Sequence, residues 1–362
     1  MNTRQSSPLS EALAMVAPGQ PLREGLDRIL RAKRGGLVVV GDGPGVLSIC
    51  SGGFLLDAEF SPQRLSELAK MDGAIILAAD ASRIARANVH LMPKATIPTS
   101  ETGTRHRTAE RVARSIAVPV LSVSAAMSVI AVYRNDYKHT VQPTGWLHDR
   151  TDQALATMQH FRNRFDVALN GLSVLEVEDT VSVGDVVAVV QAAEMVLRIA
   201  EEVEGYLVEL GEDGRLVGLQ SAELIDGVAP TLHLVVRDYC GNPPVKGDRL
   251  SAVNQAVKEL AGLSAEELAD DTRIAEVLGL PGAFKDTESG VEPRGYRLLY
   301  RLPRFSDAII ERIVDRFVNL QQIMRASLGE LEQVDGVGQA RAHSVKDGLA
   351  RLAEASIFER YQ

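Results

Sequence analysis

The chain has 362 residues, of which 45% are hydrophobic and 24% charged, so it can bury more than one hydrophobic core and we expect two or three domains. Its two cysteines, Cys50 and Cys240, match no metal-ligand spacing, which argues against a disulfide framework or a zinc site and fits a reducing compartment. No apolar run approaches the ~18 to 20 residues that cross a bilayer, and Met1 to Ser10 is polar rather than signal-like. We therefore expect a cytoplasmic protein that has no membrane partner.

The formal net charge of -9 is distributed unevenly along the chain. Residues 1–148 contain 17 basic and 12 acidic side chains, residues 149–290 contain 11 and 26, and residues 291–362 contain 11 and 10. The middle segment would therefore repel a polyanion that the two end segments would tolerate. The same three segments are the domains that we expect.

The first segment alternates short β-branched runs with helical stretches, which predicts a mixed α/β domain. Strands are expected at residues 36–40, 74–78, 120–124 and 129–133, and helices at residues 61–70 and 108–116. Ser61 and Pro62 are typical of a helix start, because serine caps free amides and proline fits the first helical position. Residues 46–49 also have the pattern of a strand.

Helical spacing dominates the second segment. Between residues 180 and 210, apolar residues recur every three or four positions and further valines occupy the other faces, so this long helix should be largely buried. Residues 241–247 contain Pro243-Pro244 and should form a loop, and residues 264–278 should form more helix. No catalytic combination of residues occurs here, so we interpret residues 149–290 as a helical spine.

The third segment is predicted to be helical apart from an interruption at Gly336-Val337-Gly338. With the apolar positions on either side, this interruption resembles a helix-hairpin-helix, in which glycines permit a tight turn whose amides contact a DNA phosphate without reading bases. The alternative is an ordinary glycine-containing helical turn. An earlier interruption at residues 302–306 lacks the two glycines and should serve as a packing partner. The residues expected to contact DNA are Gly336, Val337, Gly338, Arg341 and Lys346.

A candidate anion site follows Gly103 in the first segment. Glycine lets a ligand approach the backbone, and the next residues begin a helix whose free amides and dipole attract phosphate. Arg105 and Arg107 add guanidinium groups that match phosphoryl oxygens, and His106 can donate a further hydrogen bond. Asp72 precedes a predicted strand, where a carboxylate can orient or deprotonate a sugar hydroxyl or hold a divalent metal. The sequence therefore predicts a site of triphosphate size.

Other interpretations fit parts of this segment. An Asp-Gly pair before a strand is most often a turn, and an Arg-His-Arg run can be a solvated loop. Lys70-Met71-Asp72-Gly73 matches the Lys-x-Asp-Gly of covalent nucleotidyltransferases such as DNA ligases, in which Lys70 would carry AMP, but Ile75 replaces the arginine of that motif. The glycines of residues 41–45 lead into a strand-like run, which disfavours a dinucleotide-binding loop, and no P-loop motif occurs. A DNA-binding scaffold without activity is the remaining alternative.

Asp72-Gly73-Ala74, followed about thirty residues later by Gly103-Thr104-Arg105-His106-Arg107, resembles the signature of the diadenylate cyclase family. The C-terminal hairpin extends the resemblance to the DNA-integrity-scanning members of that family and thus over the whole chain. The resemblance implies a multidomain fold of the classes α/β and all-α. It would have an N-terminal mixed-sheet α/β cyclase domain, a central helical spine and a C-terminal helix-hairpin-helix domain.

This resemblance implies that two ATP molecules condense to cyclic di-AMP with release of pyrophosphate. Each cyclase domain would hold one ATP, and two domains would face each other so that each 3′-hydroxyl attacks the α-phosphorus of the other nucleotide. It also implies a Mg or Mn ion, a homo-octamer built around the spine, and binding of branched DNA.

Carried over to this sequence, the resemblance assigns catalytic roles to Asp72, Arg105, His106 and Arg107, and Asp72 would also hold the metal. Leu91 would contact the adenine and Ser124 a phosphate. The full set of expected ATP-binding residues is Asp72, Gly73, Leu91, Thr104, Arg105, His106, Arg107, Thr108 and Ser124.

Overall fold

The computed structural model describes residues 8–241, 249–280 and 288–359, and the chain divides into two compact units. An N-terminal unit comprises Met1–Gln153 and Val203–Leu219, and a C-terminal unit comprises Ala154–Glu202 and Gln220–Gln362. Among the described elements, the helices that contribute to both units are α6 (Thr144–Glu178), α7 (Val183–Leu210) and α8 (Arg215–Ile225). The loop expected at residues 241–247 lies, apart from its first residue, outside the described ranges.

A mixed eight-stranded sheet forms the centre of the N-terminal unit, which confirms the predicted fold class. Its strand order is β2-β5-β4-β1-β6-β7-β8, with β3 paired to β5 beside this path. Strands β1 and β4 run parallel, whereas the other pairings are antiparallel. The strands are β1 (Gly36–Val40), β2 (Cys50–Ser51), β3 (Phe54–Glu59), β4 (Ala74–Leu77), β5 (Arg83–Leu91), β6 (Val120–Ser124), β7 (Val129–Arg134) and β8 (Tyr137–Val141).

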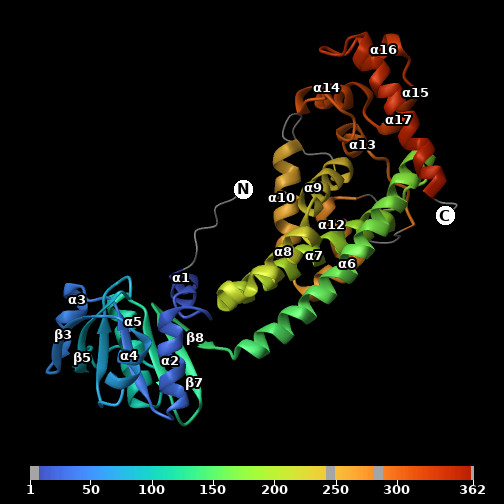
Figure 1. Cartoon of the computed structure of the whole chain (residues 1–362). Coiled ribbons are helices and arrows are strands. Elements are labelled where there is room, and N and C mark those ends of the chain that lie inside the picture. Colours follow the sequence, from blue (N-terminus) through green and yellow to red (C-terminus); the bar gives the residue numbers. More distant parts are fainter. Residues whose placement is uncertain (1–7, 242–248, 281–287, 360–362) are drawn as a thin grey trace. The chain divides into compact units, whose positions relative to one another are not determined.

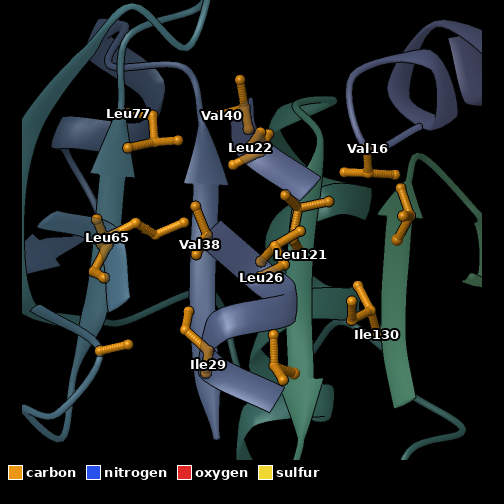
Figure 2. Packing of buried hydrophobic residues seen from close by; sticks show 14 of the residues in the cluster. Val16, Leu22, Leu26, Ile29, Val38, Val40, Leu65, Leu77, Leu121 and Ile130 are labelled. Carbon is orange, nitrogen blue, oxygen red and sulfur yellow. The ribbon is translucent and has the colours of Figure 1, made fainter. Parts of the chain in front are cut away.

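Helices cover both faces of this sheet (Figure 1). One face packs against α1 (Pro8–Ala14), α2 (Pro21–Arg31) and α4 (Pro62–Leu68), and the other against α3 (Pro44–Leu47) and α5 (Thr104–Ile116). Successive residues of β1 alternate between the two cores. Val38 and Val40 pack with α2, as Figure 2 shows, whereas Leu37 and Val39 pack with α5. Burial on both faces explains why the central strands are continuous apolar runs.

Two predictions of local structure in this unit have opposite outcomes. Ser61 caps α4 as expected, because its hydroxyl oxygen accepts a hydrogen bond from the Arg64 amide at 3.2 Å. The strand predicted for residues 46–49 is wrong, because Pro44 opens the single helical turn α3, in which Val46 is buried. Proline is pre-organised for a first helical position, and this outweighs the β-branched pattern after it. A single turn is also too short for the helix that a dinucleotide-binding loop requires.

The C-terminal unit is helical (Figure 1). The long buried helix predicted at residues 180–210 is α7, and the helix predicted at residues 264–278 is divided in two, because Asp270 caps a new helix through the Thr272 amide at 3.0 Å. In the described part of the chain, no helix combines the length and apolarity needed to cross a membrane. The other helices are η1 (Gly211–Gly214), in the N-terminal unit, and α9 (Val228–Tyr239), α10 (Arg249–Gly262), α11 (Ala265–Leu268), α12 (Asp271–Leu278), α13 (Tyr296–Tyr300), α14 (Asp307–Phe317), α15 (Leu320–Arg325), α16 (Leu328–Glu332) and α17 (Gln339–Glu359).

Glu194 and Asp238 are among the acidic side chains that are buried in this unit. Glu194 on α7 is 3% exposed, and burial raises its pKa to about 7 even though Arg198 lies 3.9 Å away. Asp238 on α9 is 1% exposed and accepts hydrogen bonds from three successive amides at the start of α13. The donors are Gly295 at 2.7 Å, Tyr296 at 2.6 Å and Arg297 at 2.8 Å. Arg297 also pairs with Glu176 of α6, so the C-terminal helices are bonded to the spine helices.

Candidate active site

The sheet register gathers three chain segments at one edge of the N-terminal sheet. Leu37 pairs with Ala74, and Gly36 pairs with Val123. The turn that carries Asp72, the start of β1 and the end of β6 at Ser124 therefore lie along the same edge.

Asp72 and Arg105 meet at this edge. Asp72 lies in the turn between α4 and β4, and Arg105 lies in the first turn of α5. Arg105 Nη2 is 2.8 Å from Asp72 Oδ1, and the two side chains are 46% and 93% exposed. An exposed pair of this kind contributes only ~0 to 1 kcal/mol to stability, so a charged ligand can replace either partner.

Two glycines make room for this arrangement. A Cβ atom at Gly35 would lie 2.6 Å from Arg105 Nη1, and a Cβ atom at Gly73 would lie 2.6 Å from the carbonyl carbon of Asn88. Any side chain at either position would displace its neighbour. Gly73 was predicted as a site residue and Gly35 was not, although a glycine doublet directly before a buried strand is a signal that could have found it.

The N-terminus of α5 supplies the rest of the predicted anion site. Gly103 is the N-cap residue, and the side chains of Thr104, Arg105 and Arg107 are exposed. Thr108 is half-buried, and its hydroxyl donates a hydrogen bond to the Thr104 carbonyl oxygen at 2.9 Å. Among the described residues, no carboxylate forms an ion pair with Arg107. The first amides of a helix have no intrahelical acceptor, so this end of α5 can bind an anion.

His106 is placed differently from the two arginines beside it. It is 8% exposed, and its Nδ1 lies 2.8 Å from the hydroxyl oxygen of Tyr133 on β7. Burial lowers the pKa of His106, so the ring is neutral near pH 7. His106 therefore belongs to a buried polar cluster, unlike the exposed Arg105 and Arg107 on either side of it.

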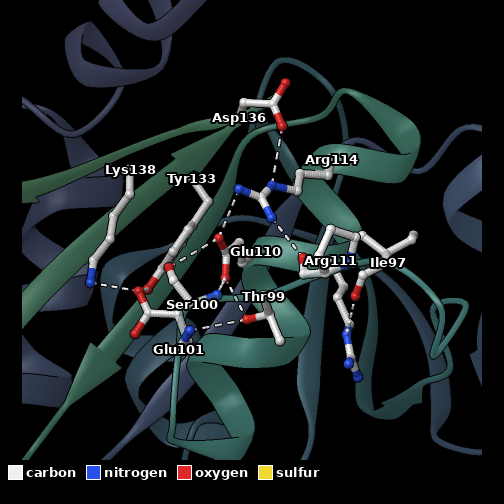
Figure 3. Close-up of polar contacts among 11 residues, drawn as sticks. Ile97, Thr99, Ser100, Glu101, Glu110, Arg111, Arg114, Tyr133, Asp136 and Lys138 are labelled. Carbon is white, nitrogen blue, oxygen red and sulfur yellow. Dashed lines mark hydrogen bonds and ion pairs between the residues drawn. The ribbon is translucent and has the colours of Figure 1, made fainter.

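The loop between β5 and α5 is fixed to the helix by polar contacts (Figure 3). Glu110 accepts a hydrogen bond from the Ser100 amide at 3.0 Å, and Arg111 donates to the Ile97 carbonyl oxygen at 2.9 Å. The same loop carries Glu101, which accepts a hydrogen bond from the Tyr133 hydroxyl at 3.1 Å. These contacts join residues ten or more positions apart, and no local pattern in the sequence signalled them.

Leu91 and Ser124 have local partners. Leu91 is 6% exposed and packs in the core beneath α5, so its side chain offers little surface to an adenine. The Ser124 hydroxyl oxygen accepts a hydrogen bond from the Met127 amide at 3.3 Å in the next turn. Among the described residues, neither side chain forms a hydrogen bond or an ion pair with Asp72 or Arg105.

Asp72 suits a metal ion that is shared with a phosphate ligand. Its carboxylate is 93% exposed. Over residues 8–241, 249–280 and 288–359, no group of three or more His, Cys, Asp or Glu side chains is arranged to hold an ion. Mg²⁺ commonly binds through one or two carboxylates together with substrate phosphates. The donor set therefore fits Mg or Mn carried with a nucleotide.

Lys70, the nucleophile of the ligase alternative, occupies a surface position after α4. Its Nζ lies 2.6 Å from Glu67 Oε2, and the two side chains are 49% and 67% exposed. A lysine nucleophile is usually activated by desolvation or by a second cation. The Lys70 side chain is about half exposed and its partner is a carboxylate rather than a second cation, so the structure gives the ligase alternative no support.

The predicted hairpin connects α16 to α17 in the C-terminal unit. Gly336 has a φ of +85°, in the left-handed region that favours glycine. Val337 is 3% exposed and donates its amide to the Val334 carbonyl oxygen at 2.9 Å, so this residue packs inward. Gly338 directly precedes α17, whose first amides have no intrahelical acceptor. Arg341 is exposed and donates to the Gly336 carbonyl oxygen at 2.7 Å.

The structure also describes Lys346 and the earlier turn at residues 302–306. Lys346 is half-buried, and its Nζ donates to the Met324 carbonyl oxygen at 2.7 Å at the end of α15. In the turn between α13 and α14, Arg304 has a φ of +71° and lies three residues before the next helix, as Gly336 does. Both turns therefore have a residue with positive φ three positions before the next helix, although only the later turn has glycine there.

Two domain families match the chain. Residues 23–137, which include Asp72 and Arg105, match the family described as DisA bacterial checkpoint controller nucleotide-binding. Residues 141–286 match the family described as DisA bacterial checkpoint controller linker region.

Whole proteins match over nearly the full length. The DNA integrity scanning protein DisA of Streptomyces coelicolor is 50% identical over 350 residues, covering 97% of this chain and 93% of that protein. The protein of the same name from Kineococcus radiotolerans is 51% identical over 354 residues, covering 98% and 97%. A solved double mutant of DacA from Staphylococcus aureus is similar over 38% of this chain and 91% of that chain, with a TM-score of 0.30 and 21% identity. The relatives and the domain matches together show that this chain belongs to the DisA family of diadenylate cyclases.

Proposed function

We propose that this nucleotidyltransferase condenses two ATP molecules at a pair of facing N-terminal units and that its C-terminal helices contact DNA. One observation carries the enzymatic part, the contact of 2.8 Å between Asp72 and Arg105 at the start of α5. It places a carboxylate that can act on a hydroxyl and hold a metal beside cations and amides that can bind a triphosphate.

In this proposal each triphosphate lies against the N-terminus of α5. The helix amides and Thr104 bind the phosphates, and Arg105 and Arg107 neutralise the charge that develops on the leaving pyrophosphate. Asp72 orients the 3′-hydroxyl and accepts its proton as the bond from the 3′-oxygen to the α-phosphorus forms and the bond to pyrophosphate breaks. Mg or Mn bound with the nucleotide would supply further charge neutralisation. The remaining residues proposed to contact the nucleotide are Gly73, His106, Thr108 and Ser124, and Leu91 would do so through its backbone because its side chain is buried.

A single unit cannot complete this product. Cyclic di-AMP contains two phosphodiester links, so each nucleotide supplies one hydroxyl and one α-phosphorus and two pyrophosphates leave. Two facing units would place each hydroxyl beside the phosphorus of the other nucleotide, which removes much of the entropic cost of a bimolecular reaction. We therefore propose a dimer of cyclase domains as the minimum assembly. The family resemblance supports an octamer around residues 149–290.

For the C-terminal helices we propose contact with DNA phosphates, including those of branched DNA. The amides at Gly338 and the guanidinium of Arg341 lie at the start of α17, and Gly336 shapes the turn. Lys346, which is half-buried, and Val337, which is buried, would act mainly by holding the hairpin together. The printed name of the relatives, DNA integrity scanning protein, supports this part of the proposal. The corresponding domains would be residues 1–148, 149–290 and 291–362.

The enzymatic proposal is tested by incubating the protein with ATP and Mg or Mn and identifying the product by mass spectrometry. Asp72→Asn should lower the rate of synthesis by at least ~100-fold, because the carboxamide keeps the shape but neither accepts the proton nor neutralises the metal. Asp80→Asn, at an exposed turn after β4, is the control and should keep the wild-type rate. Wild-type turnover in Asp72→Asn would contradict the proposal, and a lysyl-AMP adduct on Lys70 would favour the ligase alternative.

A further inference from the structure

A buried hydrogen-bond chain lies behind the candidate site. His106 Nδ1 is 2.8 Å from the Tyr133 hydroxyl oxygen, and the Tyr133 hydroxyl donates to Glu101 Oε1 at 3.1 Å. Glu101 also pairs with Lys138 Nζ at 2.5 Å. Figure 3 shows Tyr133, Glu101 and Lys138 together. Tyr133 is 1% exposed and the Glu101 side chain 13%, so little water competes for the contacts.

The charged groups determine which atom donates and which accepts in each of these hydrogen bonds. Burial works to raise the pKa of Glu101, but hydrogen bonds from Lys138 and Tyr133 outweigh it and hold the pKa below its usual range, so Glu101 is an ionised acceptor. Burial, together with the negative charge of Glu101, raises the pKa of Tyr133, which keeps its proton. Since a phenol has one hydrogen and Tyr133 donates it to Glu101, its oxygen must accept from His106 Nδ1–H. Neutral His106 therefore has an unprotonated Nε2.

The opposite edge of the imidazole faces the start of α5. A methyl group added at Gly103 would lie 3.5 Å from Cδ2 of His106, the atom bonded to Nε2. Gly103 is also the N-cap of the helix proposed to hold the triphosphate. An unprotonated Nε2 and a phosphate oxygen are both acceptors and repel each other, whereas a protonated Nε2 donates a charge-assisted hydrogen bond.

We propose that Tyr133 and Glu101 are positioning residues that hold His106 with Nδ1 inward, so that binding of a triphosphate takes up one proton at Nε2. This inference rests on the proposed function, because it requires the triphosphate to lie at the start of α5. A neutral imidazole that was free to change tautomer could donate from Nε2 without gaining a proton. The hydrogen bond from His106 Nδ1–H to Tyr133 prevents this change of tautomer.

The charged groups around His106 come from each element beside it. Glu101 on the loop favours the cationic ring, whereas Lys138 on β8 and Arg105 on α5 oppose it. Glu110, one turn further along α5, is already engaged by the loop and by Arg114 at 3.1 Å. Burial keeps the ring neutral in the free protein, and the several negative charges of a triphosphate would reverse that balance.

Calorimetric titration of the full-length protein with α,β-methylene-ATP, an analogue that cannot react at the α-phosphorus, tests this inference in the presence of Mg²⁺. The titration is done at about pH 7.5, above the ordinary pKa of histidine. Across buffers of different ionisation enthalpy, the slope of the binding enthalpy gives the number of protons taken up. The wild-type protein should take up about one proton more than His106→Gln, whose amide donates without titrating. Its affinity relative to that variant should fall about tenfold per pH unit above pH 7.

Tyr133→Phe distinguishes positioning from a purely structural role. Loss of the hydroxyl frees Nδ1, so the neutral ring can move its hydrogen to Nε2, and the excess proton uptake should fall to less than half. Glu101→Gln should produce the same change, and it serves as the second test if Tyr133→Phe lowers the unfolding temperature. Tyr137→Phe, at a position 62% exposed on β8, is the matched control and should behave as wild type.

Two results would overturn the inference. One is equal proton uptake by the wild-type protein and His106→Gln, and the other is wild-type uptake in both Tyr133→Phe and Glu101→Gln. A protein that makes the dinucleotide without excess proton uptake would leave the proposed function standing and remove only this inference. Failure of the wild-type protein to bind the analogue would overturn both.

Discussion

Replacing Gly35 with alanine tests whether the position of Arg105 controls the rate. The new Cβ would lie 2.6 Å from Arg105 Nη1 and 3.0 Å from its Cζ. The Val123 carbonyl oxygen, at 3.4 Å, is at an ordinary contact distance and need not move. The guanidinium is the flexible partner, so it would retreat by roughly 1 Å to reach a normal contact distance.

A shift of that size would break the contact of 2.8 Å with Asp72 and move a cation away from the bound triphosphate. Misplacing a catalytic group by about 1 Å can cost about 100-fold in rate. Arg107 and the helix amides would remain in place, so we expect Gly35→Ala to lower kcat by about 10- to 100-fold. This corresponds to about 1.4 to 2.7 kcal/mol of activation free energy.

Pyrophosphate release at saturating ATP measures kcat, and thermal unfolding measures the stability of each variant. Gly43→Ala is the matched control, because a Cβ there would meet nothing within 4 Å, and it should change neither quantity. A wild-type kcat for Gly35→Ala would show that the reaction tolerates a displaced Arg105 and would refute the reasoning. A fall in stability as large as the rise in activation free energy would instead indicate a damaged fold.

Two further predictions concern the C-terminal unit. Burial raises the pKa of Glu194 to about 7, so the folded unit retains a proton that the unfolded chain, with a pKa near 4.5, releases. The free energy of unfolding should therefore fall as pH rises from about 5 to 7, by on the order of 1 to 3 kcal/mol, and Glu194→Gln should flatten this decline. Urea unfolding at several pH values measures it, and an equally steep decline in the variant would count against the assignment. Arg341→Ala should weaken DNA binding and reduce the slope of log affinity against log salt by about 0.9 for one lost phosphate contact. Fluorescence anisotropy measures both quantities, with the exposed Arg351→Ala as the control, and equal losses in the two variants would place the contact elsewhere.

Local patterns in the sequence were sufficient for β1, β4, β6, β7, α4 and α5 of the N-terminal unit. The strands β1 and β4 are apolar runs buried on both faces, and the cap at Ser61 is encoded within four residues. Residues 46–49 were misassigned because one proline just before them decides the backbone conformation. Patterns of this length predict a strand or a helix, but they do not show when a single residue at a helix start determines the conformation of the apolar residues after it.

The candidate site could be predicted only in part, for a related reason. Asp72 and Arg105 were predicted because each lies in a short motif of recognisable residue types, and the structure brings the two side chains together. Gly35, Tyr133 and Glu101 were missed because their contacts, with Arg105, His106 and Tyr133 respectively, depend on strand register and on the path of a loop. Sequence spacing does not show which face of a strand a side chain occupies, so it did not predict that Leu91 is buried.

The carboxyl group of Asp238 limits how the last helices of the chain can move. It supplies the cap that the first turn of α13 lacks locally, from a position 57 residues before Gly295. Moving these helices away from α9 would exchange three protein hydrogen bonds for bonds to water, each at a cost of about 0.5 to 1.5 kcal/mol. The hydrogen bonds of Asp238 and the ion pair between Arg297 and Glu176 therefore couple the position of α13 to those of α9 and α6.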